Sequence, residues 1–462
     1  MPKQATGLAL STLSLLTVFT ASAGLAVAKL TPQRHLVPQP PAVAERATVR
    51  TGAVLPAAGT GARAPDPAVL ARSLGPLLAD AGAPISAAVT DAATRRPLFA
   101  AGADRPATPA STTKLVTSVA ALAALGPAHR IATRTVRGGD GEVVLVGGGD
   151  PTVTTRPTQK PQEDPAFASL ADLARQTAAA LRAVGAREVR VDYDVSAYQG
   201  PATAHGWKPN YLPDGEVAPV SALTVDEGRV APGDPSRDQR VSDPPAAATA
   251  AFARLLTREG VTARPGRRTT APRGAAALGT VLSPTAAELV EHLMTHSDND
   301  VAEAMVRQVA IKMGRPGSFD AGAQAVTQVL AGLGVPGGIR VNDGSGLSTA
   351  NQITPAALAE VVSLAAAPDR PRLRAAITGM PVAGFSGTLD APRYTLPGSR
   401  AGAGAVRAKT GTLAGVSTLA GVAHDADGRV LAFAFMMGDG RDAVDPAVLD
   451  RLAAVLATCG CR

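Results

Sequence analysis

Apolar residues recur with helical or strand spacing along most of the chain, beginning at residues 67–80. A helical repeat is formed there by Val69, Leu70, Leu74, Leu77 and Leu78. Residues 85–89 and 97–101 predict two strands joined by a polar turn. A helix is then predicted from Pro109 to about Leu125, where a Gly-Pro pair stops it.

The pattern changes character between residues 130 and 285. Strands are predicted at 142–146 and 187–193, and helices at 166–184 and 245–259. We interpret this region as a smaller α+β domain.

Helical spacing resumes after residue 285 and gives way to strands near the C-terminus. The predicted elements are a helix to residue 313 interrupted at 296–300, helices at 319–333 and 355–366, strands at 405–422 and 430–437, and a helix at 445–457. Since strands fall early and late with helices between them, we expect a sheet whose edges come from both ends of the chain, with helices on its faces.

An apolar N-terminal segment precedes these elements. Residues 4–28 carry no charge and end in Ala26-Val27-Ala28, which is typical of signal-peptidase sites. The segment is also long enough to span a bilayer. We therefore expect residues 1–28 to be a signal peptide or a membrane anchor, followed by a Pro/Ala-rich linker at 29–65. Either alternative predicts export.

Composition narrows the possible functions. The 462 residues are 45% hydrophobic but only 3% aromatic, which predicts an aliphatic core. The net charge is +7, yet the arginines form no dense run interleaved with aromatics, so we expect no nucleic-acid partner. Cys459 and Cys461 are the only cysteines and lie too close together to staple the fold. We assign them no function and expect neither a metal nor a cofactor.

Lysine is rare, and its positions are informative. Only seven of the 45 Lys and Arg residues are lysines, and Lys114 closes the motif Ser111-Thr112-Thr113-Lys114 at a predicted helix start. Residues three apart share a helix face, so Ser111 and Lys114 should be neighbours. Lysine can lose its proton when buried, whereas arginine cannot. The motif therefore suits a serine nucleophile with a lysine base. Burial of Lys114 and the positive charge of a nearby Lys409 would both lower the pKa of that base.

Two further motifs follow in the chain. Ser297-Asp298-Asn299 interrupts a predicted helix, and its alternative role is a helix cap, since Asp300 and Glu303 have capping-box spacing. Lys409-Thr410-Gly411-Thr412 lies in a predicted strand, where a glycine would let a bound chain approach the backbone. An edge strand with a solvated lysine is the alternative.

In this order the three motifs are the signature set of penicillin-binding proteins and serine β-lactamases. From residue 67 to 456 the chain resembles the D-alanyl-D-alanine carboxypeptidase/endopeptidase family, the class C low-molecular-mass penicillin-binding proteins of peptidase S13 type. The segments that carry the resemblance are 109–115, 147–151, 218–223, 297–300, 343–348 and 409–413. Ser297 follows Ser111 by 186 positions, a wider spacing than in class A β-lactamases.

The resemblance implies an α+β fold. A penicillin-binding, serine β-lactamase-like domain with an antiparallel sheet flanked by helices would comprise residues 66–129 and 286–462. A smaller inserted α+β domain at 130–285 would interrupt it, and a second inserted domain would be reduced or absent.

The resemblance also implies residue roles. Ser111 would be the acylated nucleophile and Lys114 its base. Ser297 would relay a proton, adjusted by Lys409, and Asn299 would bind the substrate backbone. The substrate would lie against Thr410, Gly411 and Thr412, with Thr410 and Thr412, together with Lys409, binding its terminal carboxylate. The N–H groups of Ser111 and Thr412 would form the oxyanion hole.

The implied activity is a serine D-Ala-D-Ala carboxypeptidase that cleaves peptidoglycan stem peptides through an acyl-enzyme, with endopeptidase action left open. β-Lactams would acylate the same serine, and the protein would act outside the cytoplasm, secreted or anchored through residues 1–28.

Two alternatives stay open, a serine β-lactamase and a catalytically silent wall-binding or β-lactam-sensing module. The only glutamates between the second and third motifs, Glu303 and Glu360, lack the asparagine four residues on that class A enzymes use for deacylation. We therefore expect a long-lived penicilloyl-enzyme.

Overall fold

The computed structural model describes residues 62–157, 165–234, 239–335 and 337–460. The predicted signal peptide or anchor at 1–28, nearly all of the linker and Cys461 lie outside the described residues. Among the helices of the described ranges, none is both long and apolar enough to cross a bilayer.

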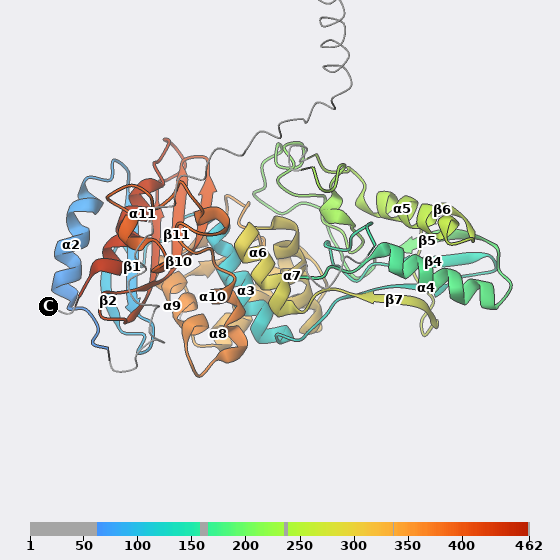
Figure 1. The fold of residues 1–462 in the computed structure, drawn as a ribbon, viewed down its shortest axis with the longest axis horizontal. Helices are drawn as coiled ribbons and strands as arrows, with labels where there is room; N and C mark the ends of the chain where they lie inside the picture. Colours follow the sequence, from blue (N-terminus) through green and yellow to red (C-terminus); the bar gives the residue numbers. More distant parts are fainter. Residues whose placement is uncertain (1–61, 158–164, 235–238, 336, 461–462) are drawn as a thin grey trace, which may run out of the picture. The chain divides into compact units, whose positions relative to one another are not determined.

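Residues 66–129 and 286–460 form one part of the fold, and a five-stranded antiparallel sheet lies at its centre (Figure 1). The strand order in this sheet is β10-β11-β12-β1-β2. Its strands are β1 (Ile85–Asp91), β2 (Pro97–Ala101), β10 (Val406–Leu413), β11 (Val416–His424) and β12 (Val430–Met437). The edge strands come from the two ends of the chain, which confirms that prediction. The single strand predicted at 405–422 is wrong, because a turn at Gly415, with φ of 69°, divides it into β10 and β11.

Side chains alternate across this sheet and separate two cores. Phe433 and Phe435 face the core shared with α2 (Pro67–Ala79) and α11 (Ala447–Thr458). Ala432 and Ala434 face the opposite core, where α9 (Pro355–Ala366) lies against the sheet. The small alanine side chains let this helix pack closely on the strands. The predicted α+β fold with an antiparallel sheet between helices is therefore confirmed.

Helix α3 (Thr113–Leu125) is buried on nearly all sides. It packs against α6 (Ala286–His296), α7 (Asn299–Lys312), α8 (Phe319–Gly332) and α9. Ten of its thirteen residues are buried, as expected for a helix surrounded by other helices. A side chain on its first turn, such as Lys114, is therefore removed from water. The short helix α10 (Ala375–Thr378) and the strand pair β8 (Ile339–Arg340) and β9 (Gln352–Ile353) complete this part.

The interrupted helix predicted before residue 313 is confirmed as α6 and α7, and the helix-cap role considered for Ser297-Asp298-Asn299 is confirmed as well. Asp298, and not Asp300, caps α7, and its Oδ1 accepts a hydrogen bond of 2.8 Å from Val301 N. Ser297 ends α6 in a left-handed conformation, so the new helix begins earlier than the capping-box spacing indicated. Glu303 is therefore not part of a capping box at the start of α7.

Residues 130–285 hold a second five-stranded sheet, in the order β6-β5-β4-β3-β7. Its strands are β3 (Ala132–Arg137), β4 (Glu142–Val146), β5 (Glu188–Asp194), β6 (Thr262–Arg268) and β7 (Ala277–Leu282), and it packs with α4 (Leu170–Ala183) and α5 (Pro244–Arg258). Three of the strands were not predicted. The sequence of β6 contains Pro265 and Gly266, which usually argue against a strand. The division into a main and an inserted domain stays a prediction.

Candidate active site

Ser111 lies in a short 3-10 turn, Ala110–Thr112, that leads directly into α3. Ala110 has a positive φ of 48°, which is uncommon for a residue other than glycine. The turn is held because Thr113 Oγ1 donates to Ala110 O at 2.8 Å and because Gly346 packs on it. A Cβ on Gly346 would come within 1.9 Å of Ala110 O. The surroundings thus fix a strained turn that presents Ser111 at the N-terminus of a buried helix.

Lys114 joins three segments of the chain. Its Nζ donates to Ser111 Oγ at 3.0 Å, to Asn299 Oδ1 at 2.7 Å and to the carbonyl oxygen of Ser345 at 2.8 Å. In the neutral form, an amine has two N–H donors and one lone pair. Asn299 and Ser345 can accept the two donors, which leaves the lone pair for the proton of Ser111.

Burial makes the neutral form of Lys114 accessible. It lowers the pKa of Lys114 to about 8, while the Asp343 and Asp298 carboxylates act in the opposite direction. Desolvation penalises the charged form of a lysine, so this lowering follows from the position of Lys114 inside α3. The side chain is therefore suited to accept a proton near neutral pH.

Lys409 is also buried, and its Nζ donates to Thr410 O at 2.8 Å. Burial, together with the charges of Lys114 and Arg393, holds the pKa of Lys409 well below its ordinary value. The sequence predicted that Lys409 would lower the pKa of Lys114; the charge of Lys114 instead lowers the pKa of Lys409, and burial accounts for the lowered pKa of Lys114. Within the described ranges no hydrogen bond connects Lys409 with Ser297, so the predicted relay between them stays a prediction.

Gly411 shows how closely β10 approaches the nucleophile. A Cβ at this position would lie 2.9 Å from Ser111 N, 2.8 Å from Pro109 O and 2.2 Å from Thr418 Oγ1. The backbone around Ser111 fills that space, which gives a reason within the chain itself for a glycine here; the close approach of a bound chain stays a prediction. On the other side of the strand, Thr410 Oγ1 donates to Thr388 Oγ1 at 2.8 Å, and Thr412 is exposed.

Ser297 and Asn299 flank the break between α6 and α7. Ser297 has φ of 60° and ψ of 36°, and Asn299 is the first residue of α7. Asn299 Nδ2 donates to the carbonyl oxygen of Glu216 at 2.8 Å, so this amide links Lys114 to the region 130–285. Both residues line a cavity of about 410 Å³.

Glu303 was missed as a member of the site. Its buried carboxylate accepts hydrogen bonds from Gly344 N at 3.0 Å and from Ser345 N at 2.8 Å, which fixes the Ser345 carbonyl on Lys114. Burial raises the pKa of Glu303 to about 7, although Arg307 Nη1 lies 3.7 Å from its Oε2. The spacing of Glu303 and Arg307 was visible in the sequence, but their burial inside α7 was not.

The loop that carries Ser345 is itself tied to the region 130–285. Asp343 Oδ2 accepts hydrogen bonds from Trp207 Nε1 at 2.8 Å and from Ser348 N at 2.6 Å. The Asp343 carboxylate therefore accepts one hydrogen bond from within its own loop and one from Trp207, which belongs to the region 130–285.

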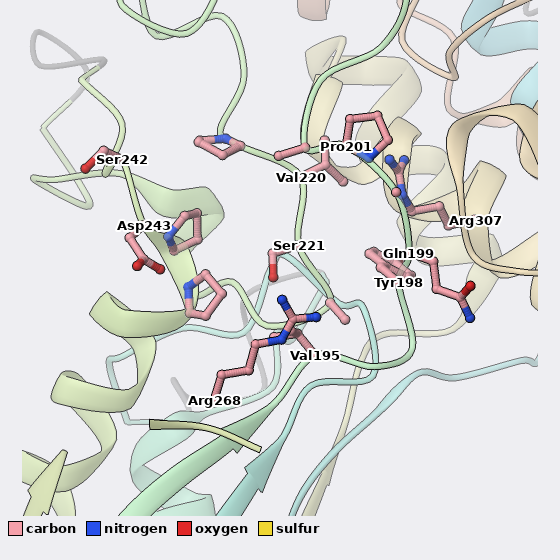
Figure 2. A pocket seen from close by; sticks show the side chains of 16 residues that line it. Val195, Tyr198, Gln199, Pro201, Val220, Ser221, Ser242, Asp243, Arg268 and Arg307 are labelled. Atoms are coloured by element: carbon pink, nitrogen blue, oxygen red, sulfur yellow. The ribbon is translucent and has the colours of Figure 1, made fainter. Parts of the chain in front are cut away.

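A separate cavity of about 290 Å³ lies within residues 195–307 (Figure 2). Tyr198, Ser221, Arg268 and Arg307 are among its lining residues. Arg307 connects it with the site, because its guanidinium carbon lies 5.3 Å from the centre of the Tyr198 ring while its Nη1 approaches Glu303. None of the residues that the sequence predicted for the active site lines this cavity.

The sequence comparisons decide the family. The model of the D-Ala-D-Ala carboxypeptidase 3 (S13) family matches residues 70–236 and 233–459. The chain belongs to this S13 family. It is 37% identical to carboxypeptidase DacB of Mycolicibacterium smegmatis over 458 residues, which cover 97% of this chain and 96% of the relative. It is also 29% identical to a D-alanyl-D-alanine carboxypeptidase of an Actinomadura species, over 81% of each chain.

The fold comparison agrees with this assignment. The crystal structure of penicillin-binding protein 4 (dacB) from Haemophilus influenzae matches with a TM-score of 0.65 at 21% identity, covering 82% of this chain and 97% of that one. Membership of the S13 family confirms the predicted serine-type D-Ala-D-Ala carboxypeptidase. Membership of a family of cell-wall carboxypeptidases also indicates that the protein acts outside the cytoplasm on cell-wall peptides.

Proposed function

We propose that Ser111 carries the acyl group in this carboxypeptidase and that Lys114 is its base. The observation that carries the proposal is the position of Lys114 Nζ, within hydrogen-bond distance of Ser111 Oγ, Asn299 Oδ1 and Ser345 O. Neutral Lys114 takes the Ser111 proton as Oγ attacks the carbonyl carbon of the penultimate D-Ala. The Ser111 proton passes to the nitrogen of the terminal D-Ala as the C–N bond breaks, so D-Ala leaves with a neutral amine, and water then hydrolyses the ester on Ser111.

The neighbouring residues stabilise and orient this reaction. The N–H groups of Ser111 and Thr412 form the oxyanion hole, a role supported by the close approach of Gly411 to Ser111 N. Thr410 and Thr412, with Lys409, bind the terminal carboxylate of the substrate, which lies along the strand that contains Gly411. Ser297 passes the proton to the leaving amine, and Asn299 orients the substrate backbone.

β-Lactams acylate the same serine, and the acyl-enzyme is long-lived. Glu303 is already engaged by two backbone N–H groups, and Glu360 Oε1 lies 3.1 Å from Arg95 Nη1. Neither glutamate is left to activate a deacylating water, which disfavours the β-lactamase alternative. The ordered contacts of Lys114 disfavour a catalytically silent module.

The segment 1–28 either anchors the chain or is removed on export, and the substrate is peptidoglycan with its stem peptides. The experiment is digestion of purified peptidoglycan by the chain lacking residues 1–28, beside its Ser111→Ala variant. Release of free D-Ala is expected from the active chain alone, and conversion of cross-linked dimers to monomers would add an endopeptidase activity. Equal release by the two proteins would contradict the proposal.

A further inference from the structure

A cluster of charged side chains lies directly behind the Ser297-Asp298-Asn299 motif. Its members line or adjoin the 410 Å³ cavity and come from three parts of the chain. They are Glu227, Arg229 and Arg240 from the region 130–285, His292 from α6, and Asp298 and Asp300 from the cap and first turn of α7. The mechanism above uses none of them. His296, Asp214 and Glu216 also lie on the wall of the cavity.

Asp298 is the member that touches the active site most directly, because it lies between Ser297 and Asn299. One carboxylate oxygen, Oδ1, caps α7. The other, Oδ2, lies 3.3 Å from His292 Nε2, and a carboxyl oxygen of Glu227 lies within 4.8 Å of a carboxyl oxygen of Asp298. The position of the motif therefore depends on what holds Asp298.

Glu227 approaches Asp298 from a strained backbone. Asp226 and Glu227 have consecutive positive φ values of 49° and 54°. The strain is held in place because the Asp226 carboxylate accepts hydrogen bonds from Thr154 Oγ1 at 2.9 Å and from Thr155 Oγ1 at 2.6 Å. Strained residues outside glycine persist where the surroundings over-determine them, and they gather at functional sites.

The two oxygens of Glu227 have different surroundings. Oε2 lies 3.0 Å from Arg229 Nε and 3.7 Å from Arg240 Nη1, so it is an acceptor. Oε1 lies 3.9 Å from His292 Nε2, which itself lies 3.3 Å from Asp298 Oδ2. Two largely buried carboxyl groups this close together cannot both be charged without repulsion, so one proton between them is favoured. The two guanidinium groups disfavour a bound metal cation in its place.

The surroundings favour protonation of Glu227 over that of Asp298. Burial and the neighbouring Asp298 and Asp300 carboxylates raise the pKa of Glu227 well above its ordinary value. The pKa of Asp298 is held below its ordinary value, because hydrogen bonds from His292, Val301 N and Glu227 outweigh the effect of burial. Asp300 pairs with Arg240 Nη2 at 3.3 Å, and burial raises its pKa to about 7.

We propose that Glu227 is a positioning residue of the acyl-transfer site. As a neutral carboxylic acid it donates a hydrogen bond to the Asp298 carboxylate and thereby holds Ser297 and Asn299 against Ser111 and Lys114. This inference rests on the proposed function of those four residues. A displacement of about 1 Å at such a site lowers a rate by as much as ~100-fold.

The test compares Glu227→Gln, Glu227→Ala and Asp214→Asn. Glutamine keeps a neutral donor to Asp298, whereas alanine removes it. Asp214→Asn makes the same carboxylate-to-amide change on the wall of the same cavity, outside the cluster. Penicillin acylation near pH 7 is expected to stay within ~3-fold of wild type in Glu227→Gln and Asp214→Asn, and to fall ~10- to 100-fold in Glu227→Ala. Loss in the glutamine variant equal to that in the alanine variant would overturn the proposal.

The pH profile separates positioning from a merely structural role. As pH rises through the pKa of Glu227, the wild type loses the donor and gains repulsion with Asp298, so acylation falls on the alkaline side. Glu227→Gln cannot ionise and is expected to lose this decline. A decline that persists in Glu227→Gln and disappears in Asp300→Asn would assign the titration to Asp300 and contradict the proposal.

A measurement independent of acylation completes the test. Hydrogen exchange of peptides covering residues 293–301 is compared at each pH between the wild type, Glu227→Gln and Asp214→Asn, all carrying Ser111→Ala. After division by the intrinsic exchange rate at each pH, loss of protection at alkaline pH is expected in the wild type and in Asp214→Asn, but not in Glu227→Gln. Equal exchange in all three would refute the positioning role, even if Ser111 proved not to be the nucleophile.

Discussion

Lys114 Nζ donates a hydrogen bond of 2.7 Å to Asn299 Oδ1, joining two motifs that lie 185 residues apart. Asn299 holds the lysine from one side, and the Ser345 carbonyl holds it from another at 2.8 Å. Because both acceptors are neutral, neither stabilises the ammonium form as strongly as a carboxylate would. The arrangement orients Lys114 toward Ser111 and still lets it lose its proton.

Asn299→Asp tests this relationship through pH. A carboxylate at the Asn299 position would favour the charged form of Lys114 and raise its pKa from about 8 by roughly 1–3 units. The neutral amine is the active base and is populated above its pKa, so the rise of acylation with pH moves to a higher pH. The second-order rate of penicillin acylation, measured from pH 6 to 11, checks this. Asn299→Ala is the control, since it removes the acceptor without adding charge, and an equal alkaline shift in that variant would refute the electrostatic explanation.

Lys114→Arg removes the base and keeps the cation. Arginine cannot be deprotonated, so acylation is expected to fall by about 10³-fold. The larger side chain in a fully buried site also costs about 1–3 kcal/mol of stability. The exposed Lys312→Arg, at the end of α7, makes the same exchange away from the site and should change neither quantity. Acylation of Lys114→Arg at a near-normal rate would mean that Lys114 is not the base.

Gly411→Ala tests the contact between β10 and the nucleophile turn. The added Cβ would lie 2.9 Å from Ser111 N and 2.8 Å from Pro109 O, so strand and turn must separate. We expect about 1–3 kcal/mol of destabilisation and slower acylation, measured by urea unfolding and by penicillin labelling.

The matched control for that variant is Gly332→Ala at the end of α8, where no atom outside its chain neighbours and the backbone of its own helix lies within 4 Å of the added Cβ. It should stabilise the protein by about 0.4–1 kcal/mol, because alanine has less conformational freedom than glycine in the unfolded chain. Gly411→Ala with normal stability and labelling would show that β10 can move away from Ser111 at no cost.

Much of the main fold was predictable because its segments have clear periodicity. The pattern of α3, with its stop at Gly126, and the alternation in β12 both gave the correct elements. The Ser111–Lys114 contact follows from helical spacing alone, and the family resemblance added the other two motifs.

Other features depend on tertiary contacts that local sequence does not encode. Strand β6 contains Pro265 and Gly266 and is stabilised by pairing with β5, which overrides its weak strand propensity. The turn at Gly415 relies on one residue with positive φ in a run of small and β-branched residues. Glu303 becomes part of the site only because α7 buries it beneath the loop of Gly344 and Ser345.

The central claim is that Ser111 is the residue acylated by β-lactams and, by the same reaction, by the substrate. Mass spectrometry of the intact chain after penicillin treatment, followed by peptide mapping, tests it most directly. One penicilloyl adduct is predicted in the wild type, located on Ser111, and no adduct in a folded Ser111→Ala variant. An unlabelled wild type, or an adduct retained in Ser111→Ala, would contradict the account.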